Sequence, residues 1–138
     1  ATALEKQGAG YVVASLGVDS GYVPYTSYSA KTSYMEKNPD IMQKFTNALQ
    51  KGMDYVQKHT PEEIARVIEP QFPETDLDTI TAIVKRYYDQ DTWKSNLIFE
   101  KESFELLEDI LEDASELNER VAYEDLVTTE YAEKAAEK

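Results

Sequence analysis

The sequence predicts an α/β fold that is mostly helical, with a few strands near its start. Two observations favour the strands: the run Tyr11–Ser15 is apolar, and the segment Tyr22–Ala30 carries no charge and is rich in tyrosine. A third observation favours the helices, because apolar residues recur at helical spacing from Asn38 onward. With 138 residues, 41% of them hydrophobic, the chain is long enough for one domain with a core.

The charge of the chain is −13 overall and is unevenly distributed. Residues 1–60 have a net charge of +1, whereas residues 61–138 have a net charge of −14. An acidic half of this size repels phosphate backbones and anionic membranes, so nucleic acid is not expected as a partner. The sequence has no cysteine, which excludes disulfides, thiolate metal sites and a cysteine nucleophile.

The first ten residues lack the basic start and the hydrophobic core of a signal peptide, and no apolar run has the length of a membrane span. These residues are helix-prone up to Lys6 and are typical of a helix that begins further upstream. Gly8 and Gly10 are expected to end that helix. We therefore expect this chain to be a piece of a longer protein.

The strands are predicted between residues 11 and 30. Tyr11–Ser15 is apolar on both faces, as in a strand that is covered on both sides. After a loop, Tyr22–Ala30 is predicted to be an extended crossing segment that is entered through Gly21. Pro24 removes a backbone donor, so this strand is expected at a sheet edge or only after the proline.

The first long helix is predicted to begin at Asn38 and Pro39 and to reach about Lys58, because asparagine caps helices and proline suits their first position. A short helical turn is expected just before it, over residues 33–37. One apolar stripe runs along the helix: Ile41, Phe45, Ala48, Leu49, Gly52 and Val56. Because Gly52 lowers helix propensity on that stripe, it predicts close packing against another backbone.

Four more helices follow, and three of them have a start signal. A capping box from Thr60 to Glu63 begins one helix, and Thr75 or Asp76 caps the next. Another helix begins near Lys101. Residues 121–126 are interpreted as a short link, and Thr128 or Thr129 is expected to cap a final helix that runs to residue 136. Trp93 lies in a break between helices, where an anchor in the core is favoured over a stacking platform for a ligand.

No catalytic residue, metal site or cofactor is predicted. His59 lacks metal-ligand partners at suitable spacing and lies beside a helix cap. Ser20 directly precedes Gly21, whereas a nucleophile elbow requires the pattern G-x-S-x-G. The glutamates of the helix after Lys101 are spaced like a solvated face, and no glycine-centred calcium loop accompanies them.

The tyrosine-rich segment is the best candidate for a ligand site. We predict that Ser20, Tyr22, Tyr25, Thr26 and Tyr28 bind a ligand, because tyrosine offers a ring face and a hydroxyl, and serine and threonine add hydrogen bonds. Such a set favours a flat or partly apolar solute. Residues 1–60 contain no arginine, so a bidentate grip on an anionic solute would have to come from elsewhere. The alternative is that the tyrosines only pack this segment.

Three pieces of the sequence together resemble a known family. They are VVASLG followed by SGYVPYT, the proline-initiated helix that ends in HTPEE, and the closing stretch VAYEDLVTTEYAEKAA. In their order and spacing they are similar to the second half of substrate-binding proteins of ABC importers. The group is the SsuA/THI5-like (NMT1-type) family, which includes sulfonate, nitrate, taurine and thiamine-precursor binders.

This resemblance implies a partial periplasmic-binding-protein-like (type II) fold. Residues 1–21 would end the second lobe, residues 22–30 would cross the hinge, and residues 31–138 would form the helical part of the first lobe. The chain would be part of an extracytoplasmic solute-binding component, in the periplasm or as a lipoprotein. It would capture a thiamine-precursor pyrimidine, a sulfonate or nitrate non-covalently and deliver it to permease subunits. An incomplete lobe would expose apolar surface and favour a dimer.

Two alternatives remain open. The first is an enzyme related to the synthases of the thiamine pyrimidine, which share this resemblance and depend on histidine and cysteine chemistry. The chain has one histidine and no cysteine, so an enzyme is not expected. The second is a helical protein-interaction module, and the strand-like Tyr11–Ser15 argues against it.

Overall fold

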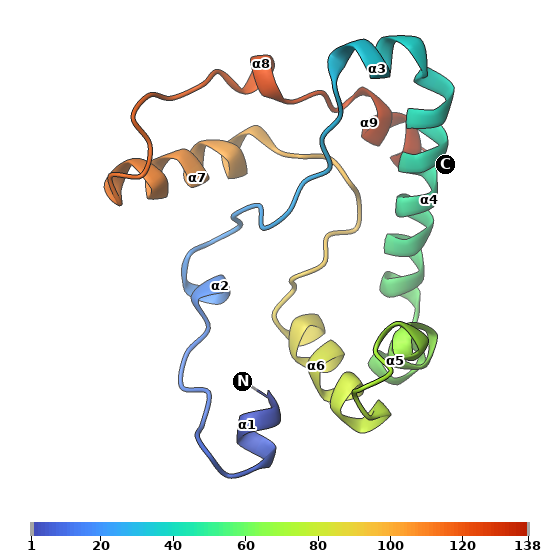
Figure 1. Ribbon diagram of the computed structural model, residues 1–138, viewed down its shortest axis with the longest axis vertical. Coiled ribbons are helices and arrows are strands. Elements are labelled where there is room, and N and C mark those ends of the chain that lie inside the picture. The colour runs from blue at the N-terminus through green and yellow to red at the C-terminus, as the bar shows by residue number, and fades with distance from the viewer. Residues whose placement is uncertain (1, 138) are drawn as a thin grey trace. The chain divides into compact units, whose positions relative to one another are not determined.

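The computed structural model describes residues 2–137, and these residues form helices joined by irregular segments (Figure 1). No strand occurs among them, so the predicted α/β, periplasmic-binding-protein-like fold is wrong for this chain. The elements in order are α1 (Thr2–Lys6), α2 (Leu16–Asp19), α3 (Thr32–Lys37), α4 (Pro39–Lys58), α5 (Pro61–Ile68), the 3₁₀ turn η1 (Glu69–Gln71), α6 (Leu77–Asp89), α7 (Lys101–Asp113), α8 (Tyr123–Leu126) and α9 (Glu130–Ala136).

Both predicted strands are irregular segments with exposed side chains. Tyr11 is 85% exposed and Val13 is 94% exposed, so the expected cover on both faces is absent from the described part of the chain. Preference for strand reflects the fit of a side chain to a pleated, partly buried surface, and a strand also needs hydrogen bonds to a neighbour. Within residues 2–137 neither segment has a neighbouring strand, so the preference of the residues is not realised.

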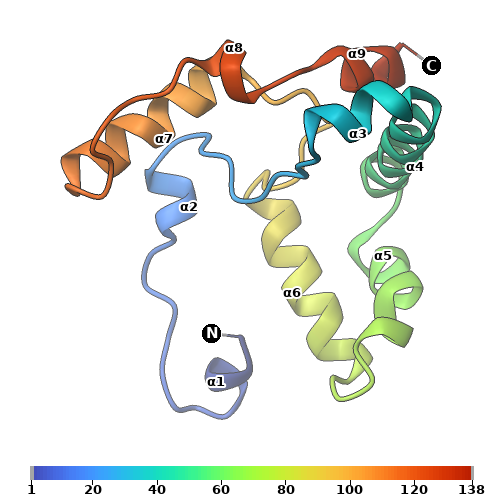
Figure 2. The ribbon, with the colours of Figure 1, turned by 45° about the horizontal axis from the view of Figure 1, so that its top comes forward.

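The helices and segments group into two compact units, each of which has its own packing. The first unit contains residues 2–19 and 52–95. Its core consists of the buried side chains of Ile64 and Ala65 on α5 and of Ile80 and Val84 on α6. Figure 2 shows α5 and α6 side by side. The side chains around this core are Tyr55, Val56, Ile68, Leu77 and Trp93.

The starts of α5 and α6 are fixed by the predicted caps. The N–H of Glu63 donates to the hydroxyl of Thr60 at 3.3 Å, and its carboxylate accepts from the N–H of Thr60 at 2.8 Å. Asp76 caps α6, because its carboxylate accepts from the N–H of Thr79 at 2.9 Å. Each cap satisfies N–H groups that have no partner inside the helix. Both predictions are confirmed.

Two side chains of α1 attach it to α6. The ammonium of Lys6 donates to the hydroxyl of Thr79 at 2.8 Å, and the carboxylate of Glu5 pairs with the guanidinium of Arg86. The helix ends in the predicted manner, because Gly8 has a φ of 69° and donates its N–H to the carbonyl of Glu5 at 2.9 Å.

Trp93 is partly buried against the core of the first unit, so the predicted anchor role is confirmed. Its ring meets that of Tyr87 edge to face, with 5.9 Å between the ring centroids. The side-chain amide of Gln57 donates to the carbonyl of Trp93 at 3.1 Å. These contacts hold the irregular segment after α6 against the core.

The second unit contains residues 20–51 and 96–137. After α7 the chain reverses and returns along that helix towards α8, as Figure 2 shows. The amide of Gln43 on α4 donates to the carbonyl of Tyr131 on α9 at 3.0 Å. Ala132 and Ala135 are the buried residues of α9.

The predicted bounds of α4 are confirmed, since it begins at Pro39 and ends at Lys58. The predicted short turn before it is also present, as α3. The expectation for Gly52 is wrong: apart from its chain neighbours and the backbone of its own helix, a Cβ built at this position would meet no atom within 4 Å. At Gly52, the apolar stripe of α4 is therefore exposed and not packed against another element.

Candidate functional site

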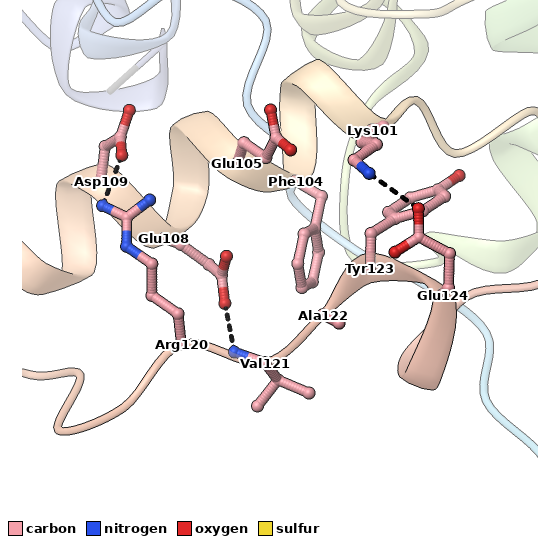
Figure 3. A pocket seen from close by; sticks show the side chains of 10 residues that line it. All are labelled: Lys101, Phe104, Glu105, Glu108, Asp109, Arg120, Val121, Ala122, Tyr123 and Glu124. Atoms are coloured by element: carbon pink, nitrogen blue, oxygen red, sulfur yellow. Dashed lines mark hydrogen bonds and ion pairs between the residues drawn. The ribbon is translucent and has the colours of Figure 1, made fainter.

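The candidate site is a hollow of about 390 Å³ in the second unit, between α7 and the segment that returns along it (Figure 3). This volume lies within the range of small-molecule sites. The side chains that line the hollow are Lys101, Phe104, Glu105, Glu108, Asp109, Arg120, Val121, Ala122, Tyr123 and Glu124.

A chain reversal at the end of α7 creates the hollow. Ser115 has a φ of 58°, and its N–H donates to the carbonyl of Glu112 at 2.9 Å. The N–H of Glu116 donates to the carbonyl of Leu111 at 2.8 Å, which completes the usual two-bond ending of a helix. The returning segment is then attached to α7 by the buried carboxylate of Glu108, which accepts from the N–H of Val121 at 2.9 Å.

Aromatic rings form the apolar part of the hollow. Phe104 is buried, and the ring of Tyr123 meets it edge to face with 5.7 Å between centroids. The hydroxyl of Tyr123 donates to the carbonyl of Phe99, which fixes the ring in place. Burial, with a further contribution from Glu124, raises the pKa of Tyr123, so this hydroxyl keeps its proton and remains a donor.

An ion pair lies beside the rings. The ammonium of Lys101 is 2.7 Å from the carboxylate of Glu124 and 6.0 Å from the centroid of the Tyr123 ring. The hydrogen bond between the two groups raises the pKa of Lys101 and lowers the pKa of Glu124. Both groups are therefore charged at neutral pH.

Arg120 forms a second ion-paired group at the other end of the hollow. Its guanidinium donates to the carboxylate of Asp109 at 2.6 Å and, through Nε, to that of Glu112 at 3.0 Å. The hydrogen bond to Glu112, followed by the one to Asp109, raises the pKa of Arg120 above its ordinary value.

The charge of the lining decides which solutes fit. Lys101 and Arg120 are the basic side chains in the lining, and both already have carboxylate partners. The acidic side chains outnumber them: Glu105, Glu108, Asp109 and Glu124. An anionic solute would meet net repulsion here, whereas a neutral or cationic ring would not.

The five residues predicted to bind a ligand lie outside this hollow. Ser20, Tyr22, Tyr25, Thr26 and Tyr28 are all exposed, and the exposed fraction of Tyr25 is 99%. Tyr28 meets the ring of Phe45 on α4 edge to face, with 5.1 Å between centroids. The binding role of these five residues stays a prediction.

Sequence reasoning missed the hollow for two reasons. The glutamates of α7 match the pattern of a solvated helix face, and residues 121–126 match that of a short link, whereas the structure forms α8 within them. One signal was present in the sequence: Arg120 and Tyr123 stand within an otherwise acidic stretch. These two residues indicate a site only if the chain is known to reverse at Ser115 and to bring them back beside α7. No glycine in the sequence marks that reversal.

His59 lies in the first unit, away from any group of metal-ligand residues. Its ring stacks on that of Tyr55 with 3.7 Å between centroids, and its Nδ1 is 2.8 Å from the carbonyl of Tyr55. Within residues 2–137, no three His, Asp or Glu side chains are grouped to hold a metal ion. None of the described helices is both long enough and apolar enough to span a bilayer.

Comparison with known proteins gives a curated relative. The chain is 39% identical over 134 residues to YtlA of Bacillus subtilis (strain 168), whose name describes it provisionally as a binding protein. The match covers 97% of this chain and 40% of YtlA, so the chain spans about two fifths of the length of that relative. No protein-family model matches the sequence, and no solved structure matches it. The resemblance to sulfonate, nitrate and thiamine-precursor binders therefore stays a prediction.

Proposed function

We propose that this chain is part of a protein that binds a small organic solute without changing it chemically and delivers it to the permease of an ABC importer. The protein would act outside the cytoplasm, in the periplasm or as a lipoprotein. The similarity to YtlA, which is itself named as a binding protein, supports a binding role. The family resemblance of the sequence supports the importer.

The preferred solute is a flat, neutral or cationic ring, such as a thiamine-precursor pyrimidine. The observation that carries this choice is the lining of the hollow, where the ring pair Phe104 and Tyr123 lies between two basic groups that already have carboxylate partners. A pyrimidine ring can pack against aromatic edges, and its amino group can donate to a carboxylate such as that of Glu105. A sulfonate or nitrate would have to displace a carboxylate from Lys101 or Arg120.

Binding without catalysis fits the residues better than a synthase does. A synthase of the thiamine pyrimidine would need histidine and cysteine chemistry, as the resemblance implies. The chain has no cysteine, and the ring of His59 stacks on Tyr55 in the other unit. Inside the hollow, the hydroxyl of Tyr123 is occupied by its hydrogen bond to the carbonyl of Phe99.

A thermal-shift titration of the full chain tests the proposal. A thiamine-precursor pyrimidine should raise the unfolding midpoint, and the stabilisation should reach about 2.7 kcal/mol when the solute is at 100 times its dissociation constant. Taurine and nitrate should have no effect at equal concentration. NMR spectra of the solute should remain unchanged during incubation. Stabilisation by the anions alone, or the appearance of a reaction product, would refute the proposal.

A matched pair of tyrosine variants locates the binding. Tyr123→Ala removes a ring of the hollow and should abolish the shift caused by the pyrimidine. Tyr34→Ala removes a half-exposed ring from α3, outside the lining, and should leave the shift unchanged. Tyr123→Phe keeps the ring and should retain most of the shift. Equal loss in the Tyr123 and Tyr34 variants would place the solute elsewhere.

A further inference from the structure

The long helix α4 carries exposed apolar side chains on one of its faces. Ile41, Phe45 and Ala48 lie on one side of that helix, since they are spaced by four and three residues. The exposed fractions of Ile41 and Phe45 are 52% and 43%, and Ala48 is also exposed. We call these three residues the α4 strip. Gly52 follows the strip on the same side of the helix, and a Cβ built there would meet no atom of another element within 4 Å.

The burial of α4 differs along its length: Val56 near its C-terminal end packs against the core of the first unit, whereas the apolar residues of the strip are exposed. The residue of α4 that is buried is the polar Gln50, which lies on the side of the helix opposite Ile41. The apolar α4 strip faces outward instead, and Tyr28 extends it by packing edge to face on Phe45. Exposed apolar side chains that adjoin one another on a helix can serve as a contact surface for another polypeptide.

We propose that the α4 strip is an assembly surface, covered by polypeptide that corresponds to the part of YtlA outside the match. The match uses 97% of this chain but only 40% of YtlA, so a protein of that size contains further polypeptide able to cover the strip. Burial of the strip would remove apolar surface from water, which favours association. This inference concerns assembly and does not depend on the solute.

A second copy of the chain is the weaker choice of occupant. Two copies would each bring a net charge of −13, which opposes their association. In a symmetric dimer, the α4 strip of one copy would contact the α4 strip of the other copy. The exposed Lys44 and Lys51 flank the strip, so such a contact would bring lysines together.

Cysteine labelling tests the proposal directly, because the chain has no cysteine of its own. Ala48→Cys places a thiol on the strip, and Val67→Cys places one on α5, where Val67 is 59% exposed. Each variant is prepared in the chain alone and in a chimera in which the chain replaces the matched part of YtlA. Cysteines in the remaining part of YtlA are changed to serine. The rate of reaction with a maleimide dye is then measured without any solute.

The Ala48→Cys thiol should react at least ten times more slowly in the chimera than in the chain alone. The Val67→Cys thiol should react at the same rate in both. Equal rates for Ala48→Cys in the two proteins would overturn the proposal. Protection of Ala48→Cys in the chain alone that grows with protein concentration would also overturn it, in favour of a second copy.

A second experiment covers the case in which the chimera does not fold. The chain and the outside part of YtlA are co-expressed as separate polypeptides, and the YtlA part carries a purification tag. The unchanged chain and its Val67→Lys variant should co-purify with it, whereas Phe45→Lys should not. Absence of the unchanged chain from the eluate, or equal recovery of the two lysine variants, would refute the α4 strip as the contact. Failure of the pyrimidine titration would leave this result untouched, because no solute is used.

Discussion

The buried carboxylate of Glu108 accepts a hydrogen bond from the backbone N–H of Val121 at 2.9 Å, which joins α7 to the segment that returns along it. Glu108→Ala should lower the free energy of unfolding by about 1–3 kcal/mol, because it leaves a partly buried N–H without an acceptor. Glu108→Gln should lose less, since its amide oxygen can still accept. Urea unfolding measures both changes.

Hydrogen exchange at the amide of Val121 supplies the local readout for this prediction. Exchange should be fastest in Glu108→Ala and intermediate in Glu108→Gln. If the alanine variant leaves the exchange of Val121 unchanged, the bond does not hold the returning segment.

The core of the first unit predicts a large effect at Ile80, which is 3% exposed. Ile80→Ala should lower the free energy of unfolding by about 2–5 kcal/mol, through lost burial and the cavity left behind. Val67→Ala on α5 is the control, because an exposed side chain of this kind should change stability by no more than about 0.5 kcal/mol. The fluorescence of Trp93, which packs on the same core, reports the transition. Similar midpoints for the two variants would contradict the core described above.

The helices could be predicted from sequence because their start signals are local. Thr60 and Glu63 are three residues apart and form the predicted capping box, and Asp76 and Thr79 form a cap with the same spacing. Asn38 and Pro39 likewise marked the start of α4. In each case, the side chain and the backbone group that it satisfies lie within one helical turn.

The strands and the hollow could not be predicted, because they depend on contacts that are distant in the sequence. Tyr11 and Tyr25 belong to residue types that favour strands, yet such a preference is realised only when a neighbouring strand and a covering layer are present. In the hollow, the bond between Glu108 and Val121 depends on the reversal at Ser115. Ser115 adopts a left-handed backbone conformation. Glycine in a sequence signals that such a conformation is favoured, whereas serine does not.

Asp76 predicts a specific loss of stability in acid. Hydrogen bonds from the hydroxyl and then from the N–H of Thr79 hold the pKa of Asp76 below its ordinary value of 3.8. A lowered pKa in the folded state contributes stability above pH 3.8, and this contribution is lost as the pH falls through 3.8 towards the folded-state pKa. Asp76→Asn still caps the helix but does not titrate, so it should flatten this part of the pH curve.

Urea unfolding between pH 7 and pH 2.5 measures this effect. Asp76→Asn should be less stable than the unchanged chain at pH 7, because it lacks the contribution of the charge, and should approach the stability of that chain in acid, where Asp76 is protonated. Glu74→Gln, which changes an exposed side chain just before the cap, should follow the unchanged chain throughout. Parallel curves for the Asp76 variant and the unchanged chain would show that the cap does not depend on the charge.

The charge of the hollow predicts a change in the preferred solute. Glu105→Lys would give the lining three basic and three acidic side chains in place of two and four. Binding of a thiamine-precursor pyrimidine should then weaken about two- to five-fold, and binding of taurine or nitrate should strengthen by a similar factor, as for charge interactions near a surface. Glu116→Lys makes the same change in net charge outside the lining and should alter neither affinity.

Calorimetric titrations measure these affinities at low salt and at 0.5 M salt. Salt screens the contribution of an exposed charge, so the two salt concentrations separate the effect of charge from other effects of the substitution. An equal effect of both substitutions would mean that the overall charge of the protein, and not the lining of the hollow, selects the solute.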